Sequence, residues 1–185
     1  MRTASVIKAI ALASVVFALL AACASVPSGL EPLDTVPVVD PDRYLGRWYE
    51  VARFQHSFER TLVGATAEYS LNADGTIAVL NSGFKKTLDG PYTSVKAVAR
   101  IPDADAPGRL KVKFFGLFEA DYLIFGLDSE AYAWALVGND SRDYLWFLSR
   151  TPTVGDDLLD RMKALAVAQG YDLSGLYLVP QKERE

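Results

Sequence analysis

Cysteine and histidine are almost missing from this chain, with Cys23 and His56 as the single examples among 185 residues. One cysteine can form neither an internal disulfide nor a site in which several thiolates hold zinc. His56 lies in a polar stretch, so we expect it at the surface, and it stands too isolated for a Ser/His/Asp catalytic set. We therefore expect a fold that depends on its hydrophobic core, without a metal or a cofactor.

Basic residues are in the minority: 19 Lys and Arg face 23 Asp and Glu, for a net charge of −4. Removing residues 1–22 would take away Arg2 and Lys8 and no acid, which leaves 17 basic and 23 acidic residues, or −6. This balance argues against nucleic acid as a partner and against overall electrostatic attachment to anionic lipid.

Long apolar runs are also rare, and the clearest one stands at the start of the chain. The basic segment 1–8 precedes 14 apolar or small residues, 9–22. This arrangement is typical of a secretory signal peptide, and the run is too short to span a membrane. We expect residues 1–22 to be removed from the mature protein.

The residues that end this run, Leu20-Ala21-Ala22-Cys23, resemble the lipobox of bacterial lipoproteins. The resemblance implies that Cys23 carries acyl chains on its sulfur and on its freed amine, and several chains hold a protein far more firmly than one. Ala24 stands where an aspartate would imply retention in the inner membrane. The resemblance thus implies anchoring to the outer membrane, on its periplasmic side; the alternative is a secreted protein with an incidental cysteine.

Composition divides the mature chain into three parts. Residues 23–43 hold the cysteine and four prolines among small and acidic residues, which predicts a partly extended linker. Residues 44–180 form one domain of sufficient length to bury a core, and residues 181–185 are a polar tail.

Short apolar runs separated by turn residues predict an all-β domain. The expected strands are 46–55, 64–72, 76–83, 93–101, 109–115, 121–127, 131–138 and 143–150, followed by a short strand at 176–179. Apolar and polar residues alternate most clearly over 109–114, which indicates antiparallel strands with one wet face. Between strands, an apolar stripe of Leu158, Met162, Leu165 and Ala166 predicts a helix, with Asp156 near its start and Gly170 at its end. We expect this helix to pack on the outside of a barrel.

Two motifs resemble signatures of the lipocalin family. Gly46-Arg47-Trp48 lies on the first expected strand, and Ser149-Arg150-Thr151-Pro152 follows the last one, about 100 residues later. The second signature of the family is retained only as Asp128. Residues 43–54 and 143–153 are similar to the bacterial, apolipoprotein D-like branch. The resemblance implies an eight-stranded antiparallel up-and-down β-barrel with a C-terminal helix.

The resemblance also implies roles for the signature residues. Gly46, Trp48 and Arg150 are expected to close one end of the barrel, with the guanidinium across the indole face, a contact of about 0.5–2 kcal/mol. Lipocalin barrels leave room for one small ligand. Counting alternate residues predicts the ligand contacts Ala52, Phe54, Tyr69, Val79, Ala97, Val112, Phe114, Tyr122, Tyr144, Trp146 and Leu148.

This expected lining is apolar and aromatic, which favours an acyl chain with phenols near its polar atoms. The main hypothesis is a membrane-anchored protein that stores or carries fatty acids or lysophospholipids in the cell envelope. One alternative is an enzyme that acts on a lipid or isoprenoid, with Glu50 as an acid or base unless a neighbouring arginine, such as Arg53 or Arg150, satisfies it. Another is a homodimeric envelope module, joined through outward Phe115, Leu117 and Phe118.

Overall fold

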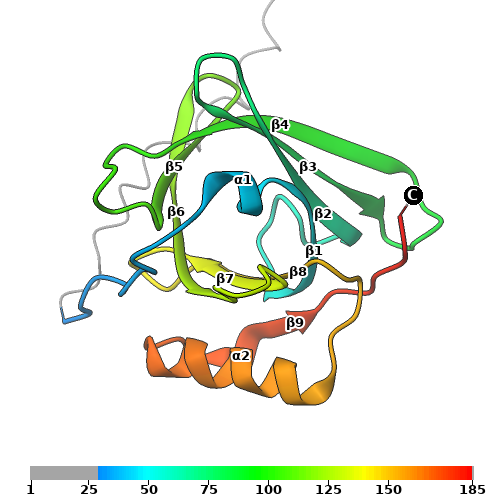
Figure 1. The fold of residues 1–185 in the computed structure, drawn as a ribbon. Coiled ribbons are helices and arrows are strands. Elements are labelled where there is room, and N and C mark those ends of the chain that lie inside the picture. Colours follow the sequence, from blue (N-terminus) through cyan, green and yellow to red (C-terminus); the bar gives the residue numbers. More distant parts are fainter. Residues whose placement is uncertain (1–28, 185) are drawn as a thin grey trace, which may run out of the picture.

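Strand β1 (Gly46–Phe54) pairs with two other barrel strands in the computed structural model, which describes residues 29–184 (Figure 1). Its first half pairs with β2 (Leu62–Leu71) and its second half with β8 (Leu145–Ser149), both antiparallel. The strands between them follow in chain order: β3 (Ile77–Lys85), β4 (Tyr92–Arg100), β5 (Arg109–Phe114), β6 (Phe118–Leu127) and β7 (Trp134–Gly138). The predicted closed, eight-stranded, up-and-down barrel is confirmed.

Helix α2 (Asp156–Ala168) lies against the outside of the barrel, as predicted (Figure 1). Asp156 and Asp157 occupy its first turn, although the N-cap is Gly155, which makes no side-chain cap. Met162 and Ala166 are fully buried in a cluster with the outward residues of β6, β7 and β8. Leu165 remains partly exposed, so the buried stripe is narrower than the sequence suggests.

A β-bulge in β1 changes which residues face the interior. The pairing of β1 with β8 shifts between Glu50 and Ala52. Glu50 lies opposite Leu148, in the interior cluster, but Ala52 lies opposite Phe147, in the cluster beneath α2. The predicted inward positions of Ala52 and Phe54 are therefore wrong, because a bulge adds one residue to a count that assumes strict alternation.

The segment that the sequence predicts as a linker is partly built into the fold. Leu33 is buried beneath α2, and Val36 and Val39 pack against the interior cluster. The following residues form helix α1 (Pro41–Tyr44), whose N-cap Asp40 accepts hydrogen bonds from two backbone amides of the helix. The expected linker thus ends before Leu33; Cys23 and the signal peptide lie outside the described residues.

The C-terminal segment is also part of the wall. Strand β9 (Leu176–Leu178) pairs with the second half of β1, where β2 has turned away, and the Gly64 N–H donates to the carbonyl of Pro180. The Gln181 amide then donates to the carbonyls of Glu50 and Ala65 and so joins β1 to β2. Residues expected to be a free polar tail therefore fill a gap between two strands.

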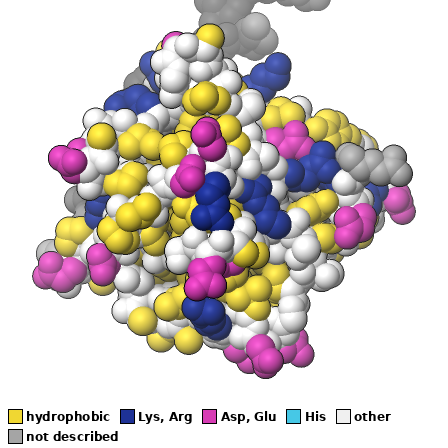
Figure 2. Space-filling view, in the orientation of Figure 1, with side chains coloured by type: hydrophobic (Ala, Val, Ile, Leu, Met, Phe, Trp, Pro, Cys, Tyr) yellow, Lys and Arg dark blue, Asp and Glu magenta, His cyan; other side chains and the backbone are white. Residues whose placement is uncertain are grey.

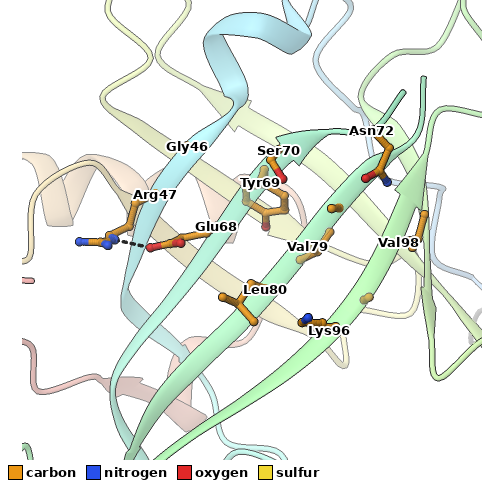
Figure 3. A pocket seen from close by; sticks show the side chains of 12 residues that line it. Gly46, Arg47, Glu68, Tyr69, Ser70, Asn72, Val79, Leu80, Lys96 and Val98 are labelled. Atoms are coloured by element: carbon orange, nitrogen blue, oxygen red, sulfur yellow. Dashed lines mark hydrogen bonds and ion pairs between the residues drawn. The ribbon is translucent and has the colours of Figure 1, made fainter. Parts of the chain in front are cut away.

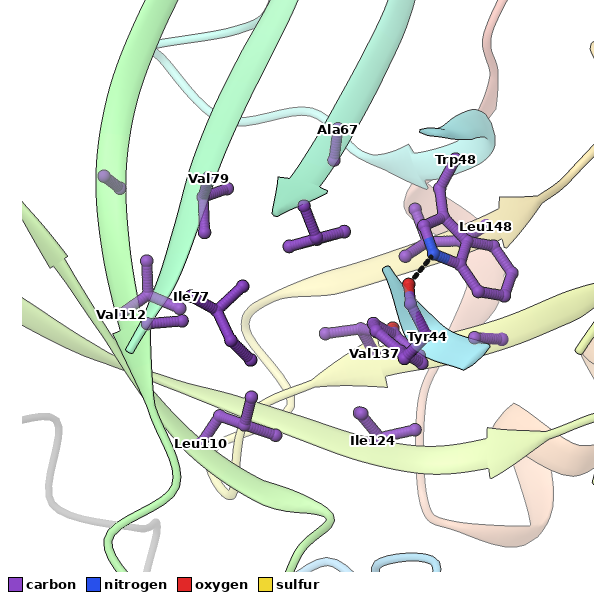
Figure 4. Packing of buried hydrophobic residues seen from close by; sticks show 14 of the residues in the cluster. Tyr44, Trp48, Ala67, Ile77, Val79, Leu110, Val112, Ile124, Val137 and Leu148 are labelled. Carbon is purple, nitrogen blue, oxygen red and sulfur yellow. Dashed lines mark hydrogen bonds between the residues drawn. The ribbon is translucent and has the colours of Figure 1, made fainter. Parts of the chain in front are cut away.

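The closed end of the barrel is held by Trp48 and Arg150. The Arg150 guanidinium carbon lies 3.8 Å from the centre of the Trp48 ring, and the indole N–H donates to the carbonyl of Tyr44, 2.8 Å away (Figure 4). Arg150 also donates to the carbonyls of Arg43, Tyr44, Arg47 and Tyr132. Gly46 has a left-handed φ of +89°, and a Cβ there would lie 3.5 Å from Arg150, which explains the glycine of the motif.

The surface of the domain is mixed in character. In the orientation of Figure 1, apolar side chains are interspersed with basic and acidic ones (Figure 2). Neither α1 nor α2 is long and apolar enough to cross a bilayer, and this holds for every helix within residues 29–184.

The closure contacts give a first prediction. Arg150→Ala should destabilise the domain by about 2–4 kcal/mol, because it removes the cation–π contact and leaves several carbonyls without their donor. Urea unfolding followed by tryptophan fluorescence measures this. Arg150→Lys should recover only part of the loss, since an ammonium lacks the planar fork. Arg100→Ala, at an exposed ion pair with Glu119, should cost less than about 1 kcal/mol; equal losses at positions 100 and 150 would refute the closing role.

Candidate functional site: the barrel interior and its mouth

Three tyrosines form the floor of the barrel interior. The hydroxyls of Tyr44 and Tyr122 are 2.8 Å apart, and those of Tyr122 and Tyr69 are 2.9 Å apart. Burial raises the pKa of each phenol, so the three stay neutral. The sequence predicts Tyr69 and Tyr122 as polar ligand contacts, but their hydroxyls are hydrogen-bonded within this chain of phenols.

Below these hydroxyls the barrel is packed. Tyr44 enters from α1, and Ile77, Leu110, Val112 and Ala99 surround it (Figure 4). The space left among them is about 10 Å³, which admits no more than one water molecule. The closed half of the barrel therefore offers no room for a ligand in this conformation.

We call the open half of the barrel the bowl; its inward side chains include Val95, Phe114 and Phe118. Connections β1–β2, β3–β4, β5–β6 and β7–β8 all lie at this end, because the strands alternate in direction. Val95 pairs with Asn81 and lies two residues before the inward Ala97, on the same face of β4. Phe118 pairs with Phe114 across the β5–β6 hairpin. Both Val95 and Phe118 face the interior, so the expected outward position of Phe118 is wrong; Val95 is 37% exposed and Phe118 is half exposed. Inward apolar residues that remain exposed show that the mouth is open to solvent.

The predicted ligand contacts fall into four groups. Tyr69, Val79, Ala97, Val112 and Leu148 lie in the buried interior cluster, and Phe114, Tyr122 and Trp146 pack against it from the mouth side. Tyr144 stands at the rim, exposed and stacked on Trp146. Ala52 and Phe54 lie outside the barrel. The ligand role of the first two groups and of Tyr144 stays a prediction.

A charged cluster of Glu50, Arg53 and Glu59 lies inside the mouth, and the sequence predicts only part of it. Arg53 is fully buried; its guanidinium donates to Glu50 at 3.2 Å and to the carbonyls of Glu59 and Leu62. A Glu59 carboxylate oxygen lies 3.6 Å from Arg53 Nε and accepts from the Trp146 indole N–H at 3.2 Å. The expectation that Arg53 satisfies Glu50 is confirmed. Glu59 could not be placed from sequence, because only the bulge turns Arg53 inward.

Two carboxylates thus share one guanidinium in a buried place. Burial raises the pKa of Glu50, and Arg53 opposes this rise. For Glu59, burial together with the nearby charge of Glu50 raises the pKa to about 8, against the opposing effects of Arg53 and Trp146. Near neutral pH the cluster therefore retains a proton on Glu59.

Aromatic rings hold the β1–β2 connection over this cluster. The His56 ring stacks on Phe58 and Tyr144, with ring centres 5.5 and 4.1 Å away. Its position is half buried, so the expected surface location is wrong in part, and burial lowers its pKa. Phe58, at the end of the stack, is largely exposed. The connection is ordered by ring contacts on one side and by the carbonyl of Glu59 on the other.

A larger hollow, about 660 Å³, is separate from the bowl. Its side chains include Glu68, Leu80, Lys96 and Val98, which alternate with the inward residues of β2, β3 and β4 and so lie on the outer face (Figure 3). Arg47 and Glu68 form an ion pair at one edge, with 2.6 Å between the charged atoms. The sheet itself separates this hollow from the barrel interior.

The architecture defines a class of protein: a small antiparallel β-barrel shut at one end by side chains, with a helix packed on its outside. Residues 39–181 match the family of lipocalin-like domains. The chain belongs to the lipocalin family.

Relatives and solved structures agree with this assignment. The chain is 43% identical over 163 residues to the outer membrane lipoprotein Blc of Escherichia coli K12, covering 88% of this chain and 90% of that protein. It is 33% identical over 150 residues to mouse apolipoprotein D, with 77% of each chain covered. Insecticyanin from the tobacco hornworm shares the fold, with a TM-score of 0.66 at 18% identity over 83% of this chain and 87% of that one.

The Glu59 site gives a prediction on pH. Its folded pKa, about 8, lies above the 4.5 of a free carboxyl, so the folded state keeps a proton that the unfolded state releases. Stability should therefore fall as pH rises from about 5 to 8. Glu59→Gln should lose this fall and gain on the order of 1–3 kcal/mol over wild type at pH 8. Urea unfolding at several pH values measures it, with Glu68→Gln as the surface control; parallel curves for wild type and Glu59→Gln would contradict the assignment.

Proposed function

We propose that this protein binds one single-chain amphiphile, a fatty acid or a lysophospholipid, in the open half of its barrel. The observation that carries the proposal is the bowl: Val95 and Phe118 face inward and remain exposed, above Phe114 and Trp146. Each methylene that an acyl chain buries there contributes about 0.8 kcal/mol. Burying half of the methylenes of a long acyl chain therefore provides a substantial favourable binding free energy, before the entropy losses of binding are subtracted.

The polar end of such a ligand belongs at the rim. The floor phenols are hydrogen-bonded to each other, whereas water and the residues of the β1–β2 and β7–β8 connections meet at the mouth. An acyl chain directed at the floor would therefore leave its head group solvated. This orientation avoids burying a charge without a partner.

We propose the cell envelope as the place of action. The Escherichia coli and Vibrio cholerae relatives are named outer membrane lipoproteins, and the Leu20–Cys23 motif has the form of a lipobox. Acylation at Cys23 would tether the domain to the outer membrane, and we propose its periplasmic face. A lipid-binding bowl on such a tether suits storage or transfer of lipid during membrane maintenance.

We propose binding rather than catalysis. Glu50, the candidate acid or base, is held by a hydrogen-bonded ion pair with Arg53. It is therefore not presented to the bowl as a free base. The chemistry of the site is that of an apolar surface.

Filling the bowl tests the function. Val95→Trp places an indole inside the mouth and should weaken binding of a fluorescent fatty acid at least about tenfold. Ser94→Trp adds the same ring one residue away on the outer, exposed face, and should bind as wild type does. Fluorescence titration measures both. Failure of wild type to bind any acyl lipid at about 10–100 μM would refute the proposal. Equal binding by both variants would show that the ligand does not bind in the bowl.

A further inference from the structure

The tip of the β5–β6 hairpin exposes large apolar side chains without support. Phe115 is 72% exposed and Leu117 is 78% exposed, and half-exposed Phe118 follows on the bowl side. Phe115 also has a left-handed φ of +52° and is followed by Gly116 at +70°. A bulky residue in that region is strained, so this turn combines backbone strain with apolar exposure. Such a combination points to a function outside the domain's own packing.

The same tip borders an opening in the side of the mouth. Pairing of β4 with β5 covers only Ala97–Arg100 of β4, which face Lys111–Phe114. The preceding part of β4, 92–96, extends past the end of β5, and among the described residues β5 supplies it no partner. Val95, inside this unpaired part, faces the bowl and is exposed. The bowl is therefore accessible from the side, between β4 and the hairpin tip, as well as from above.

Basic residues outnumber acidic ones on the strands beside this opening, in contrast to the net −4 of the chain. Strands β4, β5 and β6 carry five basic residues and two acidic ones. Three of the five are ion-paired: Arg100 with Glu119 at 3.1 Å, Lys111 with Asp121 at 2.7 Å, and Arg109 with Asp140 at 3.2 Å. Lys96 and Lys113 are exposed on the outer faces of the strands that flank the opening. Apolar tips beside cations suit a surface of lipid phosphates over acyl chains.

The N-terminal segment enters the fold on the side of the barrel, between the β7–β8 connection and the start of β5, where the carbonyl of Leu33 accepts from Arg109 at 2.6 Å. The Leu33 N–H donates to Asp140 at 2.7 Å, in the β7–β8 connection, which is one of the four connections around the mouth. Nine residues lie between Cys23 and Leu33, and the ten residue steps between them span at most about 35 Å. If Cys23 carries the proposed acyl chains, a tether of this length on the side of the barrel allows the mouth to reach the membrane that holds it.

We infer that the β5–β6 tip and the unpaired part of β4 form a membrane-docking portal: Phe115 and Leu117 insert into the bilayer surface, and an acyl chain moves sideways between β4 and the hairpin into the bowl. The inference rests on the proposed function, since it names how that site is loaded. A second copy of this chain is the competing occupant of the patch.

Transfer of a fluorescent fatty acid from vesicles of phosphatidylethanolamine and phosphatidylglycerol tests the portal. The protein is the chain from residue 24 onward, because every contact described above lies within residues 29–184 and the tether is then absent. Docking predicts that the transfer rate to wild type rises with vesicle concentration. Phe115→Ser with Leu117→Ser should slow transfer at least about tenfold, since the two side chains supply most of the inserted apolar area. Solution binding of the same probe should stay unchanged.

Leu71→Ser is the matched control, because Leu71 is 56% exposed at the end of β2, next to the β2–β3 turn at the closed end of the barrel. This variant should take up the fluorescent fatty acid from vesicles at the wild-type rate. Normal solution binding with equal transfer by wild type and the double variant would overturn the portal and leave the proposed function standing. Absence of solution binding by wild type would overturn both. A wild-type mass of two chains by light scattering that falls to one in the double variant, with transfer unchanged, would assign the patch to a dimer.

Discussion

The contact between Trp48 and Arg150 is the constraint on which the rest of the structure depends. The indole fills the barrel axis at one end, and the guanidinium lies 3.8 Å above it while it binds carbonyls from α1, β1 and the β6–β7 connection. Three separate segments are thereby held at one point. With that end shut by side chains, the strands can diverge at the other end without losing the barrel, and the bowl exists because of this asymmetry.

Strand β1 contributes residues to both apolar clusters and to the charged cluster. Because of the bulge at Glu50–Ala52, Trp48 faces the interior, Ala52 packs beneath α2, and Arg53 faces the interior again. Buried Arg53 then gathers Glu50, Glu59 and, through Glu59, Trp146. A buried ion cluster is weak evidence for stability but good at specifying one geometry, and here it holds the β1–β2 connection at the mouth.

The mouth combines features that a soluble domain normally avoids. An exposed bowl, a stretch of β4 that pairs with β3 but not with β5, and a strained aromatic turn would each favour association or aggregation. Their placement at a single end of the barrel agrees with the contact with lipid that we propose. In the proposed mode of binding, the filled closed half would keep an acyl chain close to the mouth.

Local patterns in the sequence were enough for the barrel, its closure and the outer helix. Alternation over 109–114 reports a wet and a dry face directly, and Gly46, Trp48 and Arg150 sit where the signature motifs imply, since each needs only its local chain geometry and one partner. What only the tertiary structure decided depends on long-range register. No local signal marks the bulge that turned Ala52 and Phe54 outward, the docking of Leu33 and Gln181 on distant strands, or the meeting of Arg53 with Glu59. The depth of the bowl was decided in the same way: Tyr44, from a segment expected to be linker, joins Tyr69 and Tyr122, and three residues far apart in the chain fill half of the space that alternation alone would leave empty.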